Sequence, residues 1–233
     1  VGWAEVLRHG RVPEPQLHAG LDTINRNAKS QARLIDDLLD MSRITSGKIS
    51  LEMEPVNLNQ MLNSELAAIS EAAQKRSLHL EKQLADDTVT VRADPARLQQ
   101  IFWNLLSNAL KFAPEHGLIR VALSREADSA RLTVEDNGEG IDPAMLQHIF
   151  DHFAQADGTI KRRHGGLGLG LAITRELVTM HGGRIYARSE GKGKGAVFIV
   201  DLPLFRGDDA AQVQAAAEDE SLEDLRLLVV DDE

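Results

Sequence analysis

The sequence predicts an α/β fold, a two-layer sandwich in which helices cover one face of a mixed β-sheet, preceded by a partial helical hairpin. Two observations predict the sandwich: helical and strand patterns alternate between residues 57 and 205, and two of the strands follow one another directly. A third observation predicts the hairpin, because a helical pattern of about 30 residues precedes the alternating region.

The first 47 residues are predicted to form part of a helical hairpin. Residues 1–7 have the pattern of a helix end, residues 8–15 contain the turn formers glycine and proline, and residues 16–46 form a long amphipathic helix. That helix either packs on its own domain or pairs with a second chain. Its length, well above the globular mean of about 11 to 12 residues, favours pairing. The apolar residues that recur at helical intervals are Leu21, Ile24, Ala28, Ile35 and Leu38.

Residues 48–56 are expected to be an extended connector that Pro55 closes, and residues 57–205 a single α/β domain. Each element of the domain follows from its apolar period and its flanking turn residues. The expected elements, in order, are helix 58–76, strands 78–84 and 88–92, helix 95–112, strands 118–124 and 131–135, a short helix after Pro143, helix 169–181, and strands 184–189 and 196–202.

Composition narrows the classes of function. The net charge of -10 argues against a nucleic-acid surface, and no apolar run approaches the roughly 20 residues that would span a membrane. Cysteine is absent, which excludes disulfides and cysteine-ligated zinc and agrees with a cytoplasmic setting. Much of the negative charge lies in residues 206–224, which we expect to be an acidic linker.

The helix at 95–112 carries a polar stripe. Asn104, Asn108 and Lys111 are spaced four and three residues apart, so they share one helix face, whereas the apolar residues of the helix turn toward the core. Carboxamide oxygens suit Mg²⁺, and an ammonium group can neutralise phosphate oxygens. Taken alone, the stripe would be more typical of a solvated helix face.

Two glycine-containing segments follow the stripe. Asp136 ends a strand and precedes Gly138 and Gly140, so its carboxylate could accept a hydrogen bond from an exocyclic amine such as adenine N6. A hairpin turn is the alternative for this segment. Residues 163–173 form a glycine-rich loop that opens a helix, an arrangement that presents backbone N–H groups to phosphates, and three basic residues, 161–163, lie where the loop begins.

Together these segments resemble the N, G1 and G2 boxes of the histidine kinase branch of the ATPase superfamily that also contains Hsp90, gyrase B and MutL. Residues 150–153 resemble its F box, and residues 191–198 resemble its last glycine segment. The order and the spacing of all five match over residues 57–204. The resemblance implies a Bergerat-type ATP-binding fold that uses ATP and Mg²⁺.

The resemblance also implies the role of each site residue. Asn108 would bind the magnesium ion, Asp136 would read adenine, and Asn104 and Lys111 would lie beside the phosphates as catalytic groups. Residues 154–165 would form a mobile lid. The other implied ATP-binding residues are Gly138, Gly140, Ile141, Phe153, Arg162, Arg163, Gly166, Leu167, Gly168, Leu169, Gly170 and Leu171.

The flanking segments resemble the same family. Residues 34–44 resemble the second helix of the kinase dimerisation hairpin, so a homodimer is expected, and the phosphoacceptor histidine would lie upstream of Val1. Residues 225–233 resemble the first strand of a receiver domain, with an acidic C-terminal tail as the alternative. We therefore expect a fragment of a hybrid histidine kinase whose partners are ATP or ADP and a receiver domain or response regulator.

Two other functions are compatible with the pattern. A gyrase-like or Hsp90-like ATPase would hydrolyse ATP, but the gyrase-like branch has a glutamate at the position of Asn104, and an asparagine cannot act as that base. A scaffold that binds ATP without transferring phosphate would keep the same motifs. The sequence does not identify the signal, the sensory domain or the cognate regulator.

Overall fold

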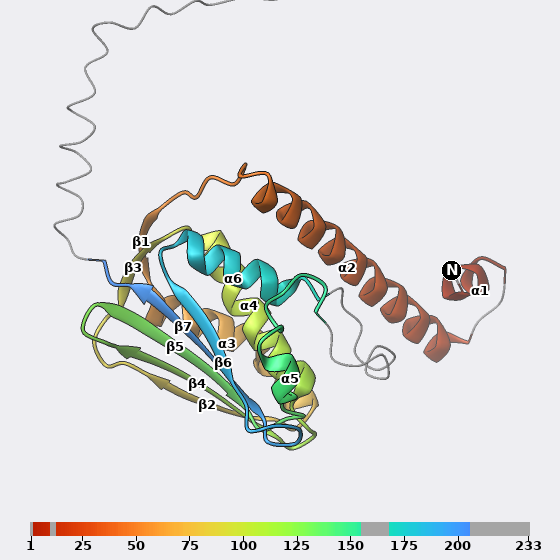
Figure 1. Ribbon diagram of the computed structural model, residues 1–233. Coiled ribbons are helices and arrows are strands. Elements are labelled where there is room, and N and C mark those ends of the chain that lie inside the picture. Colours follow the sequence, from red (N-terminus) through yellow and green to blue (C-terminus); the bar gives the residue numbers. More distant parts are fainter. Residues whose placement is uncertain (1, 10–12, 155–167, 206–233) are drawn as a thin grey trace, which may run out of the picture.

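The computed structural model describes residues 2–9, 13–154 and 168–205 of the chain (Figure 1). The predicted acidic linker at 206–224 and the receiver-like segment at 225–233 lie outside the described residues. The predicted lid, residues 154–165, also lies outside them except for Ala154.

The main sheet is mixed, as the sequence predicts. Its five strands have the order β2-β4-β5-β7-β6; β2 and β4 are parallel, and every other neighbouring pair is antiparallel. The strands are β2 (His79–Leu84), β4 (Leu118–Arg125), β5 (Ser129–Asp136), β6 (Arg184–Arg188) and β7 (Ala196–Pro203).

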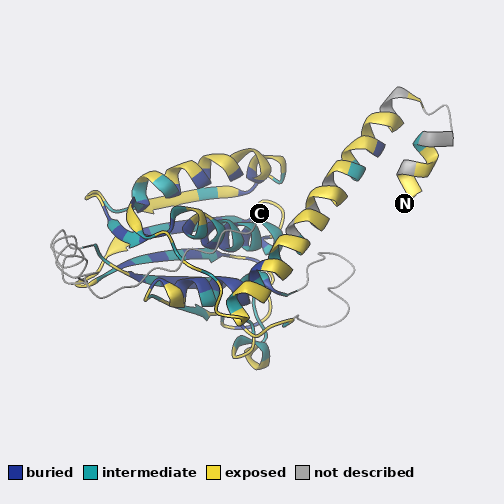
Figure 2. Ribbon diagram, turned by 90° about the horizontal axis from the view of Figure 1, so that it is seen from above, coloured by how far each residue is buried: buried dark blue, intermediate teal, exposed yellow. Residues whose placement is uncertain are grey.

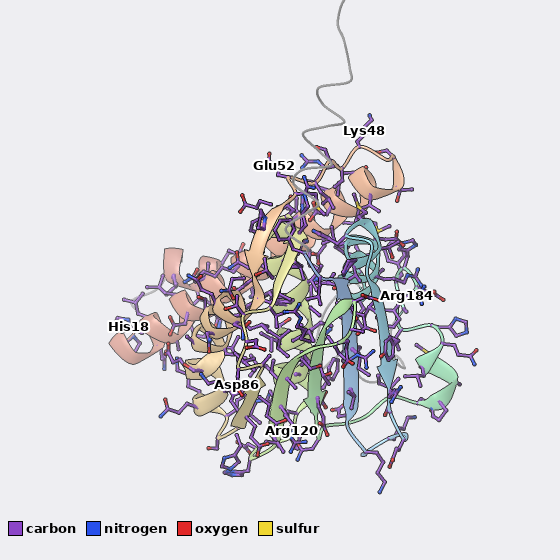
Figure 3. The ribbon with its side chains drawn as sticks, turned by 90° about the vertical axis from the view of Figure 1, so that its left-hand side faces the viewer. His18, Lys48, Glu52, Asp86, Arg120 and Arg184 are labelled. Atoms are coloured by element: carbon purple, nitrogen blue, oxygen red, sulfur yellow. The ribbon has the colours of Figure 1, made fainter. Side chains whose placement is uncertain are left out.

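Three helices cover one face of this sheet: α3 (Leu58–Lys75), α4 (Pro95–Phe112) and α6 (Gly170–Met180) (Figure 1). Along β5, every second residue is buried, which is the pattern of a strand with one face against the core. The opposite face carries charged pairs such as Arg120 with Glu81, and Arg120 is labelled there in Figure 3. The predicted two-layer sandwich is therefore confirmed.

One strand differs from the prediction. The strand expected at 88–92 is not part of the main sheet: β3 (Thr90–Ala93) pairs antiparallel with β1 (Glu54–Asn57) in a separate two-stranded sheet. The predicted connector thus ends in a strand that the sequence analysis did not assign. The physical reason is the length of β3, which has only four residues before Asp94, the N-cap residue of α4. It meets the chain after β7 through a single bridge from Val91 to Leu204.

Local signals define α4, the helix that carries the polar stripe. The side chain of Asp94 accepts a hydrogen bond from the backbone N–H of Arg97, and Pro95 occupies the first turn, where its missing N–H costs nothing. The helix ends at Phe112 because Ala113, which precedes Pro114, is extended. The residues that turn to the core are Leu98, Ile101, Phe102, Leu105, Leu106 and Ala109.

The N-terminal helices form a short hairpin. The ring of Trp3 in α1 (Gly2–His9) packs against Gly20 in α2 (Glu14–Thr45), where a Cβ atom would overlap the ring. Most of α2 is exposed, in contrast to the α/β domain (Figure 2). No helix among the described residues is both long enough and apolar enough to cross a membrane. The large apolar side chains exposed on α2 are Leu17, Leu21, Ile35, Leu38 and Leu39.

Only the C-terminal part of α2 docks on the α/β domain. Asp40, which is 8% exposed, accepts two hydrogen bonds at 3.0 and 3.1 Å from Nη1 of Arg97 and one at 2.8 Å from Nε2 of Gln100, and both donors belong to α4. Met41 and Ile44 pack against the core beside this cluster. We call Asp40, Arg97 and Gln100 the α2–α4 junction.

Candidate functional site

The polar stripe of α4 lies where the sequence analysis placed it. Asn104, Asn108 and Lys111 are half-buried on one helix face, while the neighbouring apolar residues lie in the core. The stripe lies between the start of α6 and the loop that follows β5, because Asn104 contacts Gly170 and Phe112 contacts Gly138.

Asn104 is held in one orientation by α6. Its Nδ2 atom donates to the carbonyl oxygen of Gly170 at 3.2 Å and to Oγ1 of Thr174 at 3.3 Å. A carbonyl oxygen can only accept, so the nitrogen side of the amide must face α6. The hydroxyl of Thr174 donates to the same carbonyl at 2.7 Å, which leaves its lone pair for Asn104. The amide oxygen of Asn104 is therefore the group left for a ligand.

The start of α6 has the properties of an anion-binding site. Its N-cap residue is Leu169, which makes no side-chain capping hydrogen bond, so within the described residues the N-cap side chain leaves the first backbone N–H groups of the helix uncapped. These groups and the positive end of the helix dipole lie beside Asn104, which contacts Gly170. Phosphate oxygens bind well to such a helix end.

Asp136 is the last residue of β5 and is 7% exposed. Its Oδ1 accepts a hydrogen bond from the N–H of Gly138 at 2.8 Å. Burial raises the pKa of the carboxyl group, and the backbone N–H groups of Gly138 and Ala196 oppose that rise. Gly138 has no room for a side chain, since a Cβ atom would overlap the carbonyl oxygen of Phe112. A carboxylate held at this depth can accept a hydrogen bond from an amine in the pocket.

Lys111 is a cation held away from water. Burial lowers the pKa of its ammonium group, and the negative charge of Glu139 partly opposes this. The Nζ atom lies 4.7 Å from the centroid of the Phe112 ring. Among the described residues Lys111 has no ion-pair partner within 4.0 Å. The group is therefore suited to meeting the negative charge of a ligand.

Asn108 is the residue of the stripe that fits a magnesium ion. Its half-buried side chain has no hydrogen-bond partner within the described parts of the chain, and its amide oxygen is a neutral hard ligand. The described residues contain no group of three or more His, Asp or Glu that could hold a metal by themselves. A magnesium ion here would therefore be shared between Asn108, water and the phosphates of a nucleotide, as is usual for this ion.

Ser189 supports the loop that follows β5, a role that the sequence analysis missed. Its Oγ donates to the carbonyl oxygen of Gly195 at 2.6 Å and accepts from the N–H of Ile141 at 2.9 Å. Gly140 has a left-handed φ of 66°, and a Cβ atom there would overlap the carbonyl oxygen of Gly191. The loop after β5 is thus braced by residues 189–195. A lone serine at a strand end gives no sequence signal for this role.

The structure places other predicted site residues near the start of α6 and just before the predicted lid. Phe153 is 62% exposed and has a left-handed φ of 62°, and the side chain of Leu169 lies in the core with 1% exposure. Gly168 lies at the start of α6 and abuts the backbone of Ala154, while Leu171 is half-buried. The predicted contacts Arg162, Arg163, Gly166 and Leu167 lie outside the described residues.

Comparison with known proteins shows which family and which proteins the chain resembles. Residues 93–206 match the family described as histidine kinase-, DNA gyrase B- and HSP90-like ATPase. The chain is 37% identical over 222 residues to hybrid signal transduction histidine kinase D of Dictyostelium discoideum, a match that spans 82% of this chain and 14% of that relative.

Two solved structures are similar to the whole chain or to its α/β domain. Full-length ShkA in complex with AMPPNP has a TM-score of 0.69 and 29% identity, over 87% of this chain and 42% of that one. The catalytic domain of histidine kinase ThkA has a TM-score of 0.58 and 27% identity, over 65% of this chain and 97% of that one.

Proposed function

Because residues 93–206 belong to the family of histidine kinase-, DNA gyrase B- and HSP90-like ATPases, we propose that this chain is the ATP-binding catalytic core of a hybrid sensor histidine kinase. It would transfer the γ-phosphoryl group of Mg-ATP to a histidine of the same signalling protein. The phosphoryl group would then pass to an aspartate of a receiver domain.

One observation supports the proposal: a buried carboxylate, a half-buried cation and the N-terminus of a helix converge on α4. Asp136 is buried behind the end of α4, Lys111 is in the last turn of that helix, and Asn104 is bonded to the start of α6. These groups are separated by up to 66 residues in the sequence, and the fold alone brings them together. The arrangement is complementary to a nucleotide, whose base is apolar with a polar edge and whose phosphates are anionic.

Each residue then has a role in binding. The carboxylate of Asp136 would accept a hydrogen bond from the adenine amine, the start of α6 and Lys111 would hold phosphate oxygens, and Asn108 would hold the magnesium ion. Bound magnesium would neutralise charge that develops on the transferred phosphoryl group. The predicted lid, residues 154–165, together with Phe153 and Gly166 on either side of it, would contribute the remaining contacts when ATP is bound.

The orientation of Asn104 favours transfer to histidine over hydrolysis. In the transfer, a histidine nitrogen forms a bond to the γ-phosphorus while the bond from that phosphorus to the bridging oxygen breaks, and ADP leaves. Hydrolysis needs a base to take a proton from water, and a carboxamide cannot do this. Since Nδ2 of Asn104 is bonded to α6, its amide oxygen can only orient a donor or a cation.

The acceptor histidine is proposed to lie N-terminal to Val1, in the hairpin helix that precedes α2. The buried histidine of the described domain, His181, is unsuitable, because its Nε2 accepts from the N–H of Asp94 at 3.0 Å and its Nδ1 lies 2.7 Å from the carbonyl oxygen of Leu177. The receiver would begin at residue 225, after the linker at 206–224. The chain spans 14% of the hybrid kinase named above, so these assignments concern a longer protein in the cytoplasm.

We propose that α2 pairs with a second copy of the chain through its exposed apolar face. Leu38 and Ile35 lie one turn apart on this face and are 47% and 57% exposed. Leu38→Lys should therefore shift the chain from dimer to monomer in light scattering during size exclusion, while Asp22→Lys, at an exposed position on the opposite face of the helix, should not. An unchanged dimer in Leu38→Lys, or a wild-type chain that is monomeric at every concentration, would contradict this pairing.

The proposed activity is tested by supplying the acceptor. The chain is incubated with γ-labelled ATP and a polypeptide that carries the upstream hairpin helix with its histidine. We expect label on the hairpin that is lost in acid and retained in base, as for a phosphorylated histidine. Steady release of inorganic phosphate without labelled protein would instead favour the hydrolytic ATPase, and nucleotide binding with neither result would favour the scaffold.

A further inference from the structure

Arg76, at the end of α3, holds the last turn of α4. Its guanidinium group donates from Nη1 to the carbonyl oxygen of Leu110, and from Nη2 to that of Ala113 at 2.8 Å. The backbone joins the same two segments, since the N–H of His116 donates to the carbonyl of Arg76 at 3.4 Å and that of His79 to the carbonyl of Gly117 at 2.8 Å. No motif in the sequence indicates this contact.

The local chain conformation directs Arg76 across to α4. Arg76 is the C-cap residue of α3, and Ser77, with a left-handed φ of 53°, turns the chain away from the helix axis. The side chain of Arg76 is half-buried in this position. It reaches carbonyl groups that have no partner within the helix, at the negative end of the α4 dipole. A guanidinium group suits this position, because its fork of donors can bond both carbonyl groups and its permanent positive charge faces the negative end of the dipole.

The two carbonyl groups that Arg76 holds flank Lys111 and Phe112. The carbonyl of Phe112, between them, accepts from the N–H of Glu139 at 3.3 Å, so the end of α4 is held from both sides. Lys111 has no ion-pair partner among the described residues, and its Nζ atom contacts the ring of Phe112 in the same turn. Its position therefore depends on the backbone of this turn.

We propose that Arg76 is a positioning residue of the nucleotide site, which places Lys111 against the phosphates by fixing the last turn of α4. This inference rests on the proposed function, because it assumes that the site binds a nucleotide. Arg76 acts through Lys111 and through the backbone, and touches neither the nucleotide nor the metal. If Arg76 only stabilised the fold, the effect of its substitution on nucleotide affinity would not depend on whether Lys111 is present.

The test is a double-mutant cycle on ADP affinity in the 233-residue chain. Calorimetry measures ADP binding to the wild type, Arg76→Met, Lys111→Gln and the double variant. We expect each single variant to lose about tenfold in affinity, and the double variant to lose little more than Lys111→Gln alone. Arg76→Lys, which keeps a charge and can reach one carbonyl, should recover at least about half of the wild-type affinity.

Two controls separate this role from general loss of structure. Arg125→Met removes an exposed arginine at the end of β4 and should leave ADP affinity unchanged. Thermal unfolding of each variant reports its fold, and Arg76→Lys serves in place of Arg76→Met if the latter does not fold. Additive losses in the cycle, or wild-type affinity in a folded Arg76→Met, would overturn the inference. Absence of ADP binding by the wild type would instead overturn the proposed function.

Discussion

The α2–α4 junction and the candidate site both hold charged groups that are partly or fully buried, and they treat these charges differently. At the α2–α4 junction, the carboxylate of Asp40 receives hydrogen bonds from Arg97 and Gln100, so the charge is paired inside the protein. At the candidate site, burial raises the pKa of Asp136 and lowers that of Lys111, and neither has an ion-pair partner in the described chain.

The difference separates a structural contact from a binding site. A buried charge with partners joins two elements, and its removal affects stability. A buried charge without an opposite charge destabilises the free protein, and a ligand that supplies the missing partner relieves this cost. Because Asp136 and Lys111 show opposite shifts in pKa for the same reason, the site is complementary to a molecule with a hydrogen-bond donor at one end and negative charge at the other.

The largest expected effect is on nucleotide affinity when Asp136 is changed. Asp136→Asn places an amide where the adenine amine needs an acceptor, and we expect ADP affinity to fall about a hundredfold, as when a charged hydrogen bond is lost. Calorimetry provides the measurement. Asp86→Asn, in the exposed turn after β2 (Figure 3), is the matched control and should bind as the wild type does. Equal affinity in Asp136→Asn and Asp86→Asn would remove Asp136 from the site.

The next effect is on the docking of α2. Asp40→Asn removes one charge of the junction and leaves Arg97, which is 24% exposed, without its counter-charge. We expect the free energy of local opening of residues 34–44 to fall by about 2 kcal/mol in hydrogen exchange, while ADP affinity stays constant. Asp36→Asn, an exposed acidic residue on the same helix, should not change the exchange rates. Loss of ADP affinity in Asp40→Asn would show that the two regions are not separate.

The third effect comes from changing Lys111, which should make the free chain more stable and weaken its binding of ADP. Because burial lowers the pKa of Lys111, its charged form is unfavourable in the free protein at neutral pH. Lys111→Gln should therefore raise the melting temperature of the nucleotide-free chain by a few degrees, while ADP affinity falls about tenfold. A lower melting temperature in differential scanning calorimetry would contradict the account of Lys111 as a destabilising buried charge.

The smallest effect is the pH dependence of ADP affinity and of the stability of the free chain. Lys111 loses its proton as the pH rises through its lowered pKa, below the ordinary value of 10.5. Over this window the contribution of Lys111 to the stability of the free chain rises and ADP affinity falls. Lys111→Arg stays charged, so its ADP affinity should not fall over that range. An identical pH profile in wild type and Lys111→Arg would assign the dependence to another group.

The sequence predicts the features that depend on local pattern. Asn104, Asn108 and Lys111 share a face because the helical period places them there, and Asp136 ends its strand because glycines follow it. Arg76, Ser189 and the β1–β3 pair were missed because each depends on a partner distant in the sequence. Local propensity contains no information about which carbonyl a side chain will reach once the helices have packed.

The central claim is that this chain binds an adenine nucleotide between Asp136 and the start of α6. A calorimetric titration of the wild-type chain with ADP, with and without Mg²⁺, tests it most directly. The account predicts saturable binding at one site per chain, which weakens when Mg²⁺ is removed, because Asn108 then has no ion to hold. A folded chain that releases no saturable heat with ADP under either condition would contradict it.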